Sequence, residues 1–484
     1  MNMKTKSNLI LMVFAILALA SCSEDFLDKD FRSNVSGNTL QDLAASNPEA
    51  LLTITSGIEA GNQFFLNDFS TAGHGNMHDE FGHMAYNLGF DLMSNDVVQT
   101  LSHWFVNYYN YTARIETSLR TDAVWQFYYR VIYNMNDGIR LIPADAIDSQ
   151  LRHVRGRMLT MRAFAYFQLI RVYSNGDMGI PLYTDESASG ARESVEDIKA
   201  LILSDLEEAH TLLADYNRAN KTLVNQSVVS GLLARYHLEY GSNTLAASYA
   251  AQARNGFPLM GTTGLYDGFN KISNAEWMWG ADINTATSTY YASFFSHMGN
   301  LNAGYAGLLQ SYKSVDRRIF DQISATDARK SWFVDDGNPF GLPKYANTKF
   351  IDDTDFEGDY VFMRAAEMYL IEAEAKALSG DNQGAQQALY QLVVTRDPSY
   401  TQSTNTGEDL LNEIRFHRKL ELWGEGFAFF DMKRWGTGLN RTYSGSNHAS
   451  FGFFDYPSSS PKFIFQIPLS EINANSDIGE QNPF

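Results

Sequence analysis

Residues 415–436 read Arg415-Phe-His-Arg418-Lys-Leu-Glu421-Leu-Trp-Gly-Glu425-Gly-Phe-Ala-Phe-Phe-Asp431-Met-Lys-Arg434-Trp-Gly. On a helix, Arg418, Glu421 and Glu425 are three and four residues apart and would share one face. Asp431 and Arg434 repeat this pairing one turn later. Because the surrounding residues are apolar and an unpaired buried charge is costly, we expect these charges to pair with one another. We favour a structural ion-pair network over a catalytic role, since such networks often resemble functional clusters.

The N-terminus has the pattern of a secretion signal. Lys4 and Lys6 precede an apolar run at residues 9–20, which is shorter than the ~20 residues that span a bilayer. Leu19-Ala-Ser-Cys22 follows and resembles a bacterial lipobox, and Cys22 is the only cysteine in the chain. We therefore expect a signal peptide at residues 1–21 and lipidation of Cys22. An ordinary cleaved signal with an incidental cysteine is the alternative.

Composition limits the possible partners. The formal charge is −19, and loss of Lys4 and Lys6 with the signal would take it to about −21. Such a chain repels nucleic acid, so we expect no nucleic-acid partner. Aromatic residues make up 13% of the chain, and flat rings suit sugar-binding surfaces as well as cores.

Apolar periodicity predicts a mainly helical protein. Apolar residues recur at helical spacing, and two of the predicted helix pairs are joined at Gly241-Ser-Asn243 and at Gly380-Asp381. A helix, a glycine-containing turn and an alanine-rich helix are typical of divergent tetratricopeptide-type pairs. Ser194 and Asp197 have the spacing of a capping box. The predicted helices cover 123–139, 154–169, 198–213, 229–240, 363–377 and 385–393.

Several motifs occur in one order along the chain. They are Arg162-Ala-Phe-Ala-Tyr-Phe, Gly179-Ile-Pro-Leu, Asp316-Arg-Arg, Arg364-Ala-Ala-Glu…Glu372-Ala-Glu-Ala and the 415–436 run, followed by Phe465-Gln-Ile-Pro-Leu and Asn482-Pro. Together these motifs resemble those of the SusD/RagB-like nutrient-binding lipoproteins. The resemblance covers nearly the whole chain, although each motif alone is weak.

This resemblance implies a helical scaffold with an inserted loop-rich variable region and little sheet. The expected organisation is an acidic tether at 22–38 and a single domain at 39–484, with the scaffold at about 39–256 and 360–484 and the variable region at about 257–359. Acidic residues after Cys22 resemble surface-export signals of Bacteroidetes lipoproteins. The implied protein is a glycan-binding lipoprotein, anchored to the outer membrane by lipid and facing the cell surface. It would serve a SusC-like, TonB-dependent transporter. A peptide-binding, RagB-like protein is the alternative.

Two clusters invite a metal hypothesis. His78 and His83 are five residues apart, whereas four would align a zinc pair on one helix face. With His74, Asp79 and Glu80 they favour a structural or substrate-contacting loop. The stretch 353–364 begins like a calcium loop but ends in Arg364 where a bidentate Glu is needed. We favour a solvated acidic loop, with calcium bound in another geometry as the alternative. We therefore predict no metal, no cofactor and no catalytic residue.

With metal and catalytic sites set aside, we expect the protein to bind its ligand through aromatic rings and amide groups. The acidic stretch 91–96 leads into Trp104, Asn107 and Tyr108, and SusD-like proteins often place a stacking aromatic soon after such a stretch. A sugar's C–H face packs on a ring while amides and carboxylates bind its hydroxyls. Trp277 and Trp279 alternate with Met278 as in a strand, so at least one should be in the core. The predicted ligand-binding residues are Trp104, Asn107, Tyr108 and Asp79, and in the variable region Tyr290, Tyr291, Phe294 and Trp332.

Overall fold

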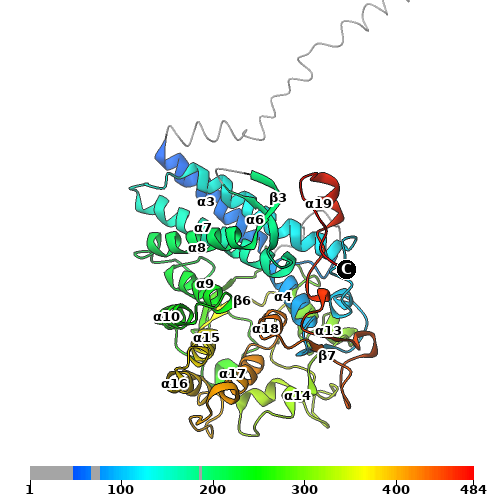
Figure 1. Cartoon of the computed structure of the whole chain (residues 1–484). Coiled ribbons are helices and arrows are strands. Elements are labelled where there is room, and N and C mark those ends of the chain that lie inside the picture. Colours follow the sequence, from blue (N-terminus) through cyan, green and yellow to red (C-terminus); the bar gives the residue numbers. More distant parts are fainter. Residues whose placement is uncertain (1–46, 67–76, 185–187) are drawn as a thin grey trace, which may run out of the picture. The chain divides into compact units, whose positions relative to one another are not determined.

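The computed structural model describes residues 47–66, 77–184 and 188–484 (Figure 1). The predicted signal peptide, Cys22, the acidic tether and His74 lie outside these residues. The chain divides into two compact units after Ile54. The described part of the first unit, residues 47–54, contains the start of helix α3, and the second unit holds all the other described elements.

Helices dominate the described residues, which confirms the predicted fold class. The long helices are α3 (Pro48–Phe65), α4 (His83–Leu92), α6 (Leu119–Leu141), α7 (Ser149–Tyr173), α8 (Val195–Leu212), α9 (Gln226–Glu239), α10 (Asn243–Ala253), α15 (Ala365–Leu378), α16 (Asn382–Val393) and α17 (Gly407–Glu421). Shorter helical pieces are α5 (Val106–Tyr109), α11 (Thr262–Leu265), α12 (Phe294–Met298), α13 (Tyr305–Leu308), α14 (Arg317–Phe320), η3 (Ala328–Trp332), α18 (Ala428–Arg434), η4 (Ser450–Gly452), η5 (Pro461–Phe463) and α19 (Leu469–Ala474).

Side-chain caps fix where several long helices begin. Ser118, Asp148 and Asn225 each accept hydrogen bonds from backbone N–H groups in the first turn of α6, α7 and α9. At α8 the hydroxyl of Ser194 accepts from the N–H of Asp197 at 3.1 Å and donates to the Asp197 carboxylate at 2.6 Å. These contacts satisfy N–H groups that a helix cannot satisfy internally.

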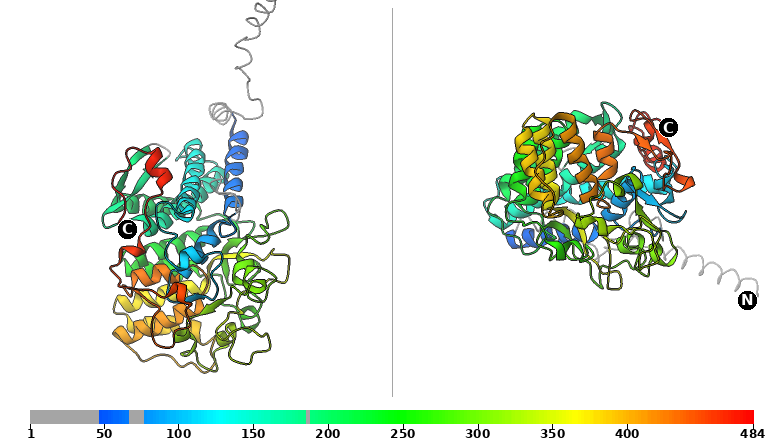
Figure 2. Two further views of the ribbon diagram at one scale, coloured as in Figure 1. Left: turned by 90° about the vertical axis from the view of Figure 1, so that its right-hand side faces the viewer. Right: turned by 90° about the horizontal axis from the view of Figure 1, so that it is seen from below.

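The long helices stack in sequence order. Contacts join α6 to α7, α7 to α8, α8 to α9 and α9 to α10, and the stack continues from α10 to α15, α16 and α17. The chain leaves this stack after α10 and returns at α15, so two helices far apart in sequence become neighbours. Figure 2 shows the yellow-green segment between them along one flank of the stack.

The strands form small antiparallel pairs. The pairs are β1 (Val97–Gln99) with β5 (Lys313–Val315), β2 (Met178–Tyr183) with β3 (Ala188–Ser194), β4 (Trp277–Ala281) with β6 (Tyr360–Arg364), and β7 (Leu439–Asn440) with β8 (Asp455–Tyr456). Trp277 lies opposite Arg364 in the β4–β6 pair. Both Trp277 and Trp279 are buried, as the alternating pattern predicted for at least one of them.

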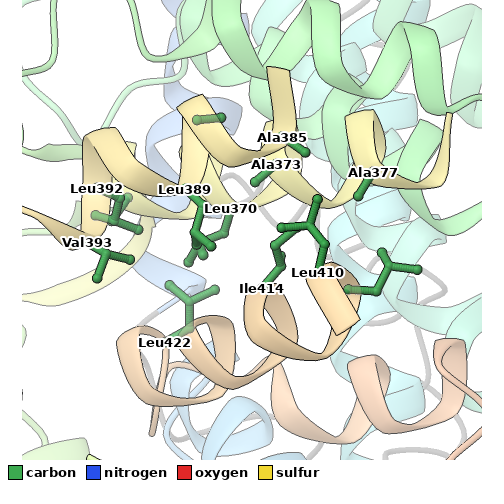
Figure 3. Close-up of a cluster of buried hydrophobic side chains, with 13 residues drawn as sticks. Leu370, Ala373, Ala377, Ala385, Leu389, Leu392, Val393, Leu410, Ile414 and Leu422 are labelled. Carbon is green, nitrogen blue, oxygen red and sulfur yellow. The ribbon is translucent and has the colours of Figure 1, made fainter. Parts of the chain in front are cut away.

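Apolar faces of α15, α16 and α17 form a close-packed cluster (Figure 3). Small side chains let α15 and α16 approach each other closely, and apolar side chains of α17 fill the remaining space. The cluster includes Leu370 and Ala373 of α15, Ala385 and Leu389 of α16, and Leu410 and Ile414 of α17. The periodicity assigned Met363 to the first of these helices, which was wrong. Met363 lies on β6, because the strand continues to Arg364 and α15 begins only at Ala365.

Candidate ligand-binding site

Aromatic side chains from distant parts of the sequence meet at the protein surface. We call this group the aromatic surface cluster; its members are His78, His103, Trp104, Tyr291, Tyr305 and Phe356. Tyr305 joins the parts, because its ring centroid lies 6.3 Å from that of Trp104, 5.3 Å from that of His103 and 5.9 Å from that of Tyr291. Phe356 extends the cluster, 5.5 Å from Tyr291.

The cluster is accessible to a ligand. Tyr291 is 48% exposed and the neighbouring Tyr290 is 57% exposed, while Trp104 and Tyr305 are half-buried. A half-buried ring is held by the protein and still presents surface to solvent. The cluster is therefore a platform of fixed rings with open edges and faces.

The small sheet of β1 and β5 positions Trp104. Gln99 at the end of β1 is fully buried, and its Nε2 donates hydrogen bonds to the carbonyls of Leu101 and Trp104 at 3.0 and 3.1 Å. Gln99 lies opposite Lys313 on β5, which brings the segment before Trp104 beside a part of the chain more than 200 residues later. One buried amide thus fixes the loop that carries the tryptophan.

Hydrogen bonds beneath the rings hold Tyr305. Its hydroxyl is 2.7 Å from Nδ1 of His78, and the ring of His297 stacks on the Tyr305 ring at 4.8 Å. Nε2 of His297 donates to the His78 carbonyl at 2.7 Å. Burial, and next Lys313, hold the pKa of His297 well below its usual range, so this imidazole is neutral. The His297 imidazole therefore supports the Tyr305 ring without carrying a charge of its own.

Three of the seven described non-glycine residues with positive φ lie at or next to these rings. Phe105, Tyr290 and Phe356 have φ values of 69°, 48° and 64°, in the left-handed region that bulky side chains avoid. Phe105 follows Trp104, Tyr290 precedes Tyr291, and Phe356 is itself a cluster member. Strained residues of this kind cost of order 1–3 kcal/mol each and concentrate at binding sites. The strain therefore supports a functional role for this surface.

Polar side chains lie close in sequence to two rings of the platform, Trp104 and Phe356. Asn107 is half-buried, and its side-chain oxygen accepts a hydrogen bond from Oγ1 of Thr112 at 3.1 Å. Among the described residues none accepts a hydrogen bond from its amide nitrogen, which leaves a donor for a ligand. Asp353 and Asp355 are exposed beside Phe356, so the charge next to the rings is negative.

Three predicted ligand-binding residues are in the core instead. Tyr108, Phe294 and Trp332 are 0%, 2% and 1% exposed, and their rings pack against other aromatic rings. Trp332 also donates its indole N–H to the carbonyl of Leu265 at 2.7 Å. These rings have no face open to a ligand, and we do not retain them in the candidate site.

Asp79 is also engaged within the protein. Its two carboxylate oxygens accept hydrogen bonds from Arg120 at 2.9 and 3.1 Å, and the residue is 2% exposed. It holds the loop before His83 against α6. Of the predicted ligand-binding residues, Trp104, Asn107, Tyr290 and Tyr291 remain accessible.

Tyr305 was missing from the sequence-based set. It begins the one-turn helix α13, which is too short to show periodicity, and it lies in a segment with no family motif. The only available signal was a tyrosine between glycines at 304 and 307, which is typical of a loop.

The C-terminal run forms part of a larger buried ion-pair network. Glu421 is fully buried and accepts hydrogen bonds from Arg329, Arg364 and Arg396 at 2.9, 2.7 and 2.9 Å. Burial alone would raise the pKa of Glu421, but these three guanidinium groups hold it well below its usual range. The whole network is Glu276, Asp327, Arg329, Lys349, Arg364, Arg396, Glu421 and Glu425.

The expected partners of Arg418 were wrong. Helix α17 ends at Glu421, so Glu425 lies beyond the helical face that the spacing assumed. Arg418 pairs with Asp431 at 2.7 Å, and Asp431 also pairs with Arg434 at 2.9 Å. Glu425 pairs with Lys349 and Arg364, each at 2.6–2.7 Å. The cations came from segments that helical spacing within one run cannot reveal.

His83, from the histidine cluster, has internal partners. His83 is buried, with Nδ1 2.8 Å from the hydroxyl of Tyr128 and Nε2 3.1 Å from Nδ2 of Asn87. Across residues 47–66, 77–184 and 188–484, no three His, Cys, Asp or Glu side chains converge as metal ligands. In those same ranges no helix is long and apolar enough to cross a membrane.

Comparison with known proteins agrees with this architecture. A SusD family model matches residues 338–484, and a model described as "Starch-binding associating with outer membrane" matches residues 72–238. A search of curated proteins finds no match to the chain.

Solved structures from Bacteroides share the fold. A SusD-like carbohydrate binding protein from Bacteroides vulgatus is 26% identical, with a TM-score of 0.77, and the match covers 88% of this chain and 97% of that one. A SusD superfamily protein from Bacteroides thetaiotaomicron is 20% identical, with a TM-score of 0.74 and coverage of 89% and 100%. A putative sugar binding protein from Bacteroides vulgatus is 21% identical, with a TM-score of 0.73 and coverage of 89% and 98%.

The helical stack, the small strand pairs and the two matching family models define the class. This chain belongs to the SusD/RagB-like family.

Proposed function

We propose that the protein is a non-enzymatic cell-surface lipoprotein that captures oligosaccharides or polysaccharides on the aromatic surface cluster. It then hands them to a SusC-like, TonB-dependent outer-membrane transporter. The observation that carries the proposal is the meeting of Trp104 with Tyr291 through Tyr305, which places two accessible rings on one fixed platform.

The chemistry of the platform suits a sugar. A pyranose ring has an apolar C–H face that packs on an aromatic ring, and hydroxyl groups at its edge that need directional hydrogen bonds. The Trp104 and Tyr291 rings would supply the first contact, and the amide of Asn107 would supply a donor for the second. Fixed rings lose little conformational entropy on binding, which favours affinity from a small contact area.

The charge beside the platform favours a neutral glycan. Asp353 and Asp355 are exposed next to Phe356, and the chain carries a formal charge of −19. Polysaccharides rich in carboxylate or sulfate groups would be repelled at low ionic strength. Neutral glycans avoid this cost.

The comparisons support the same class of ligand. The 26% identical structure is titled a carbohydrate binding protein, and one family model is described as starch-binding. The description of that model also supports an outer-membrane location. Within the proposal, lipid on Cys22 is the anchor. A peptide ligand, as in RagB-like proteins, is the alternative that the experiment must exclude.

The test is native affinity electrophoresis of the parent and of Trp104→Ala in gels containing neutral polysaccharides, with a peptide pool as a parallel arm. If Trp104 is a platform, Trp104→Ala should weaken glycan binding by about 2 kcal/mol or more, the range of anchoring residues. Its melting temperature should stay close to that of the parent, because a half-buried surface ring contributes little to the core.

Tyr266→Ala is the matched control, since Tyr266 is 49% exposed and outside the cluster. Normal retardation of Trp104→Ala by every glycan that retards the parent would contradict the site. Retention of the peptide pool without any glycan would contradict the ligand class.

A further inference from the structure

A large cavity shares no residue with the aromatic surface cluster. It is an open groove of about 650 Å³ along α6, bounded by the end of β2 and by α19. This volume is in the range of about 300–1,000 Å³ that small-ligand sites occupy.

An aromatic ladder forms one wall of the groove. Trp125, Tyr129 and Tyr133 lie four residues apart on α6, so they share one face over a length of about 12 Å at 1.5 Å per residue. The rings of Trp125 and Tyr129 have centroids 4.7 Å apart, and Tyr183 from β2 meets Tyr129 edge-on at 5.7 Å. Tyr133 is 66% exposed, so its ring is open to the groove.

The polar ends of these rings are tied to the protein. The indole N–H of Trp125 donates to the Glu471 carboxylate at 3.3 Å, and the hydroxyl of Tyr129 donates to the carbonyl of Pro181 at 2.8 Å. The carbonyl of Tyr183 accepts from Nδ2 of Asn136 at 3.0 Å. The ladder is therefore pre-organised. Trp125 is only 3% exposed and supports the others from beneath, so the ring surface open to the groove is that of Tyr133 with the half-buried Tyr129 and Tyr183.

The charges at the groove balance one another. Two arginines and two carboxylates line it, and Arg140 pairs with Asp137 one turn away on α6. The Glu471 carboxylate is engaged by Trp125 and by Nδ2 of Asn475. The groove thus offers flat rings and hydrogen-bonding groups with no net charge, which suits an uncharged, elongated ligand with apolar faces.

We propose that this groove is a second saccharide site, which takes a neutral segment of the glycan chain that the aromatic surface cluster binds. The proposal rests on the proposed function for the identity of the glycan. Two sites on one protein would hold a long chain with avidity, because binding at one raises the effective concentration of chain at the other.

The experiment uses the full chain and four variants: Trp104→Ala, Tyr133→Ala, the double variant and Tyr266→Ala as the exposed-tyrosine control. Starch, xylan, mannan and β-glucan are the gel probes. Calorimetry then uses a short oligosaccharide of whichever polymer retards the parent. Tyr133→Ala should fold normally, because its ring is exposed.

We expect the parent to bind the oligosaccharide at two sites and each single variant to bind it at one. Tyr133→Ala should raise the apparent Kd for the polymer at least tenfold. The double variant should no longer be retarded by the polymer. If Tyr133→Ala matches Tyr266→Ala in every assay while Trp104→Ala is impaired, the second site is wrong and the proposed function stands. If Trp104→Ala is normal while Tyr133→Ala is impaired, the groove stands and the proposed platform is wrong. Retention of a peptide pool at the groove in place of saccharide would overturn the inference.

Discussion

The indole of Trp104 stacks on the imidazole of His78, with ring centroids 5.7 Å apart and ring planes 13° from parallel. His78 in turn is bound through Nδ1 to the hydroxyl of Tyr305. The orientation of the tryptophan thus depends on a tyrosine that is distant in sequence and that itself contacts Tyr291.

Tyr305→Phe tests this dependence. The variant keeps the ring and loses the 2.7 Å hydrogen bond to His78. We expect glycan affinity to fall by about 0.5–1.5 kcal/mol, the net value of one such bond, because the Trp104–His78 stack loses its support. The measurement is calorimetric affinity together with the melting temperature.

Tyr291→Phe is the matched control. No hydrogen bond from the Tyr291 hydroxyl occurs within the described part of the chain, so its removal should leave the platform in place. Equal losses in the two variants would show that the hydroxyl groups contact the ligand directly and that Tyr305 has no positioning role.

Glu421→Ala tests the buried network. Removing this carboxylate leaves Arg329, Arg364 and Arg396 without their shared acceptor in a dry environment. Breaking a buried pair from one side costs about 3–5 kcal/mol, so the free energy of unfolding should drop by that amount. Chemical denaturation gives the value.

Glu408→Ala is the control on the same helix. Glu408 pairs with Arg415 at 2.7 Å, but its side chain is 67% exposed. Surface pairs contribute about 0–1 kcal/mol, so this variant should resemble the parent. A similar small effect at both positions would refute the structural role of Glu421.

His83 predicts a loss of stability in acid. Burial, and next the nearby Arg235 and Arg171, lower the pKa of His83 to about 3. A group with a depressed folded-state pKa contributes stability above its unfolded pKa of about 6.5 and loses it as the pH falls toward the folded value. The parent should therefore lose up to about 1.4 kcal/mol per pH unit through this residue between pH 6.5 and 4.5.

His83→Gln removes this titration. Denaturant midpoints of the parent and the variant, measured at pH 7.0, 5.5 and 4.5, should converge as the pH falls. Only the parent loses free energy of unfolding through the titration of His83. Parallel curves over that range would mean that the imidazole is not held neutral in the folded protein.

Cys22→Ala tests the anchor. A tri-acylated Cys22 would hold the protein stably on a membrane, since two or more chains anchor far better than one. The variant should move to the soluble fraction after cell lysis. Fractionation with outer membranes at the level of the parent would show that another feature retains the protein.

The sequence was sufficient for the helical scaffold. Helices α6–α10 and α15–α16 have regular apolar faces, and caps such as Ser194 mark their starts. The candidate site was only partly predictable. Trp104 and Tyr291 were chosen because aromatic residues near acidic or loop-like stretches suit sugar binding, yet the same criteria selected Trp332, which is buried.

The contacts that the sequence did not predict are those between residues far apart in the chain. Sequence spacing reports which residues share a face of one helix. The arginines that pair with Glu421 lie 25 to 92 residues earlier in the chain. Tyr305 lies on a single helical turn, where no period can be measured. Burial of one aromatic residue in a loop depends on its neighbours in space, which local pattern does not encode.

The order of synthesis determines when the buried network can form. Arg329, Arg364 and Arg396 precede Glu421, the carboxylate that all three contact. During synthesis these guanidinium groups stay hydrated until the C-terminal helix has been made, because burying them unpaired in a core is too costly. A chain interrupted before Glu421 would therefore remain open and reach proteases rather than persist as a smaller folded protein.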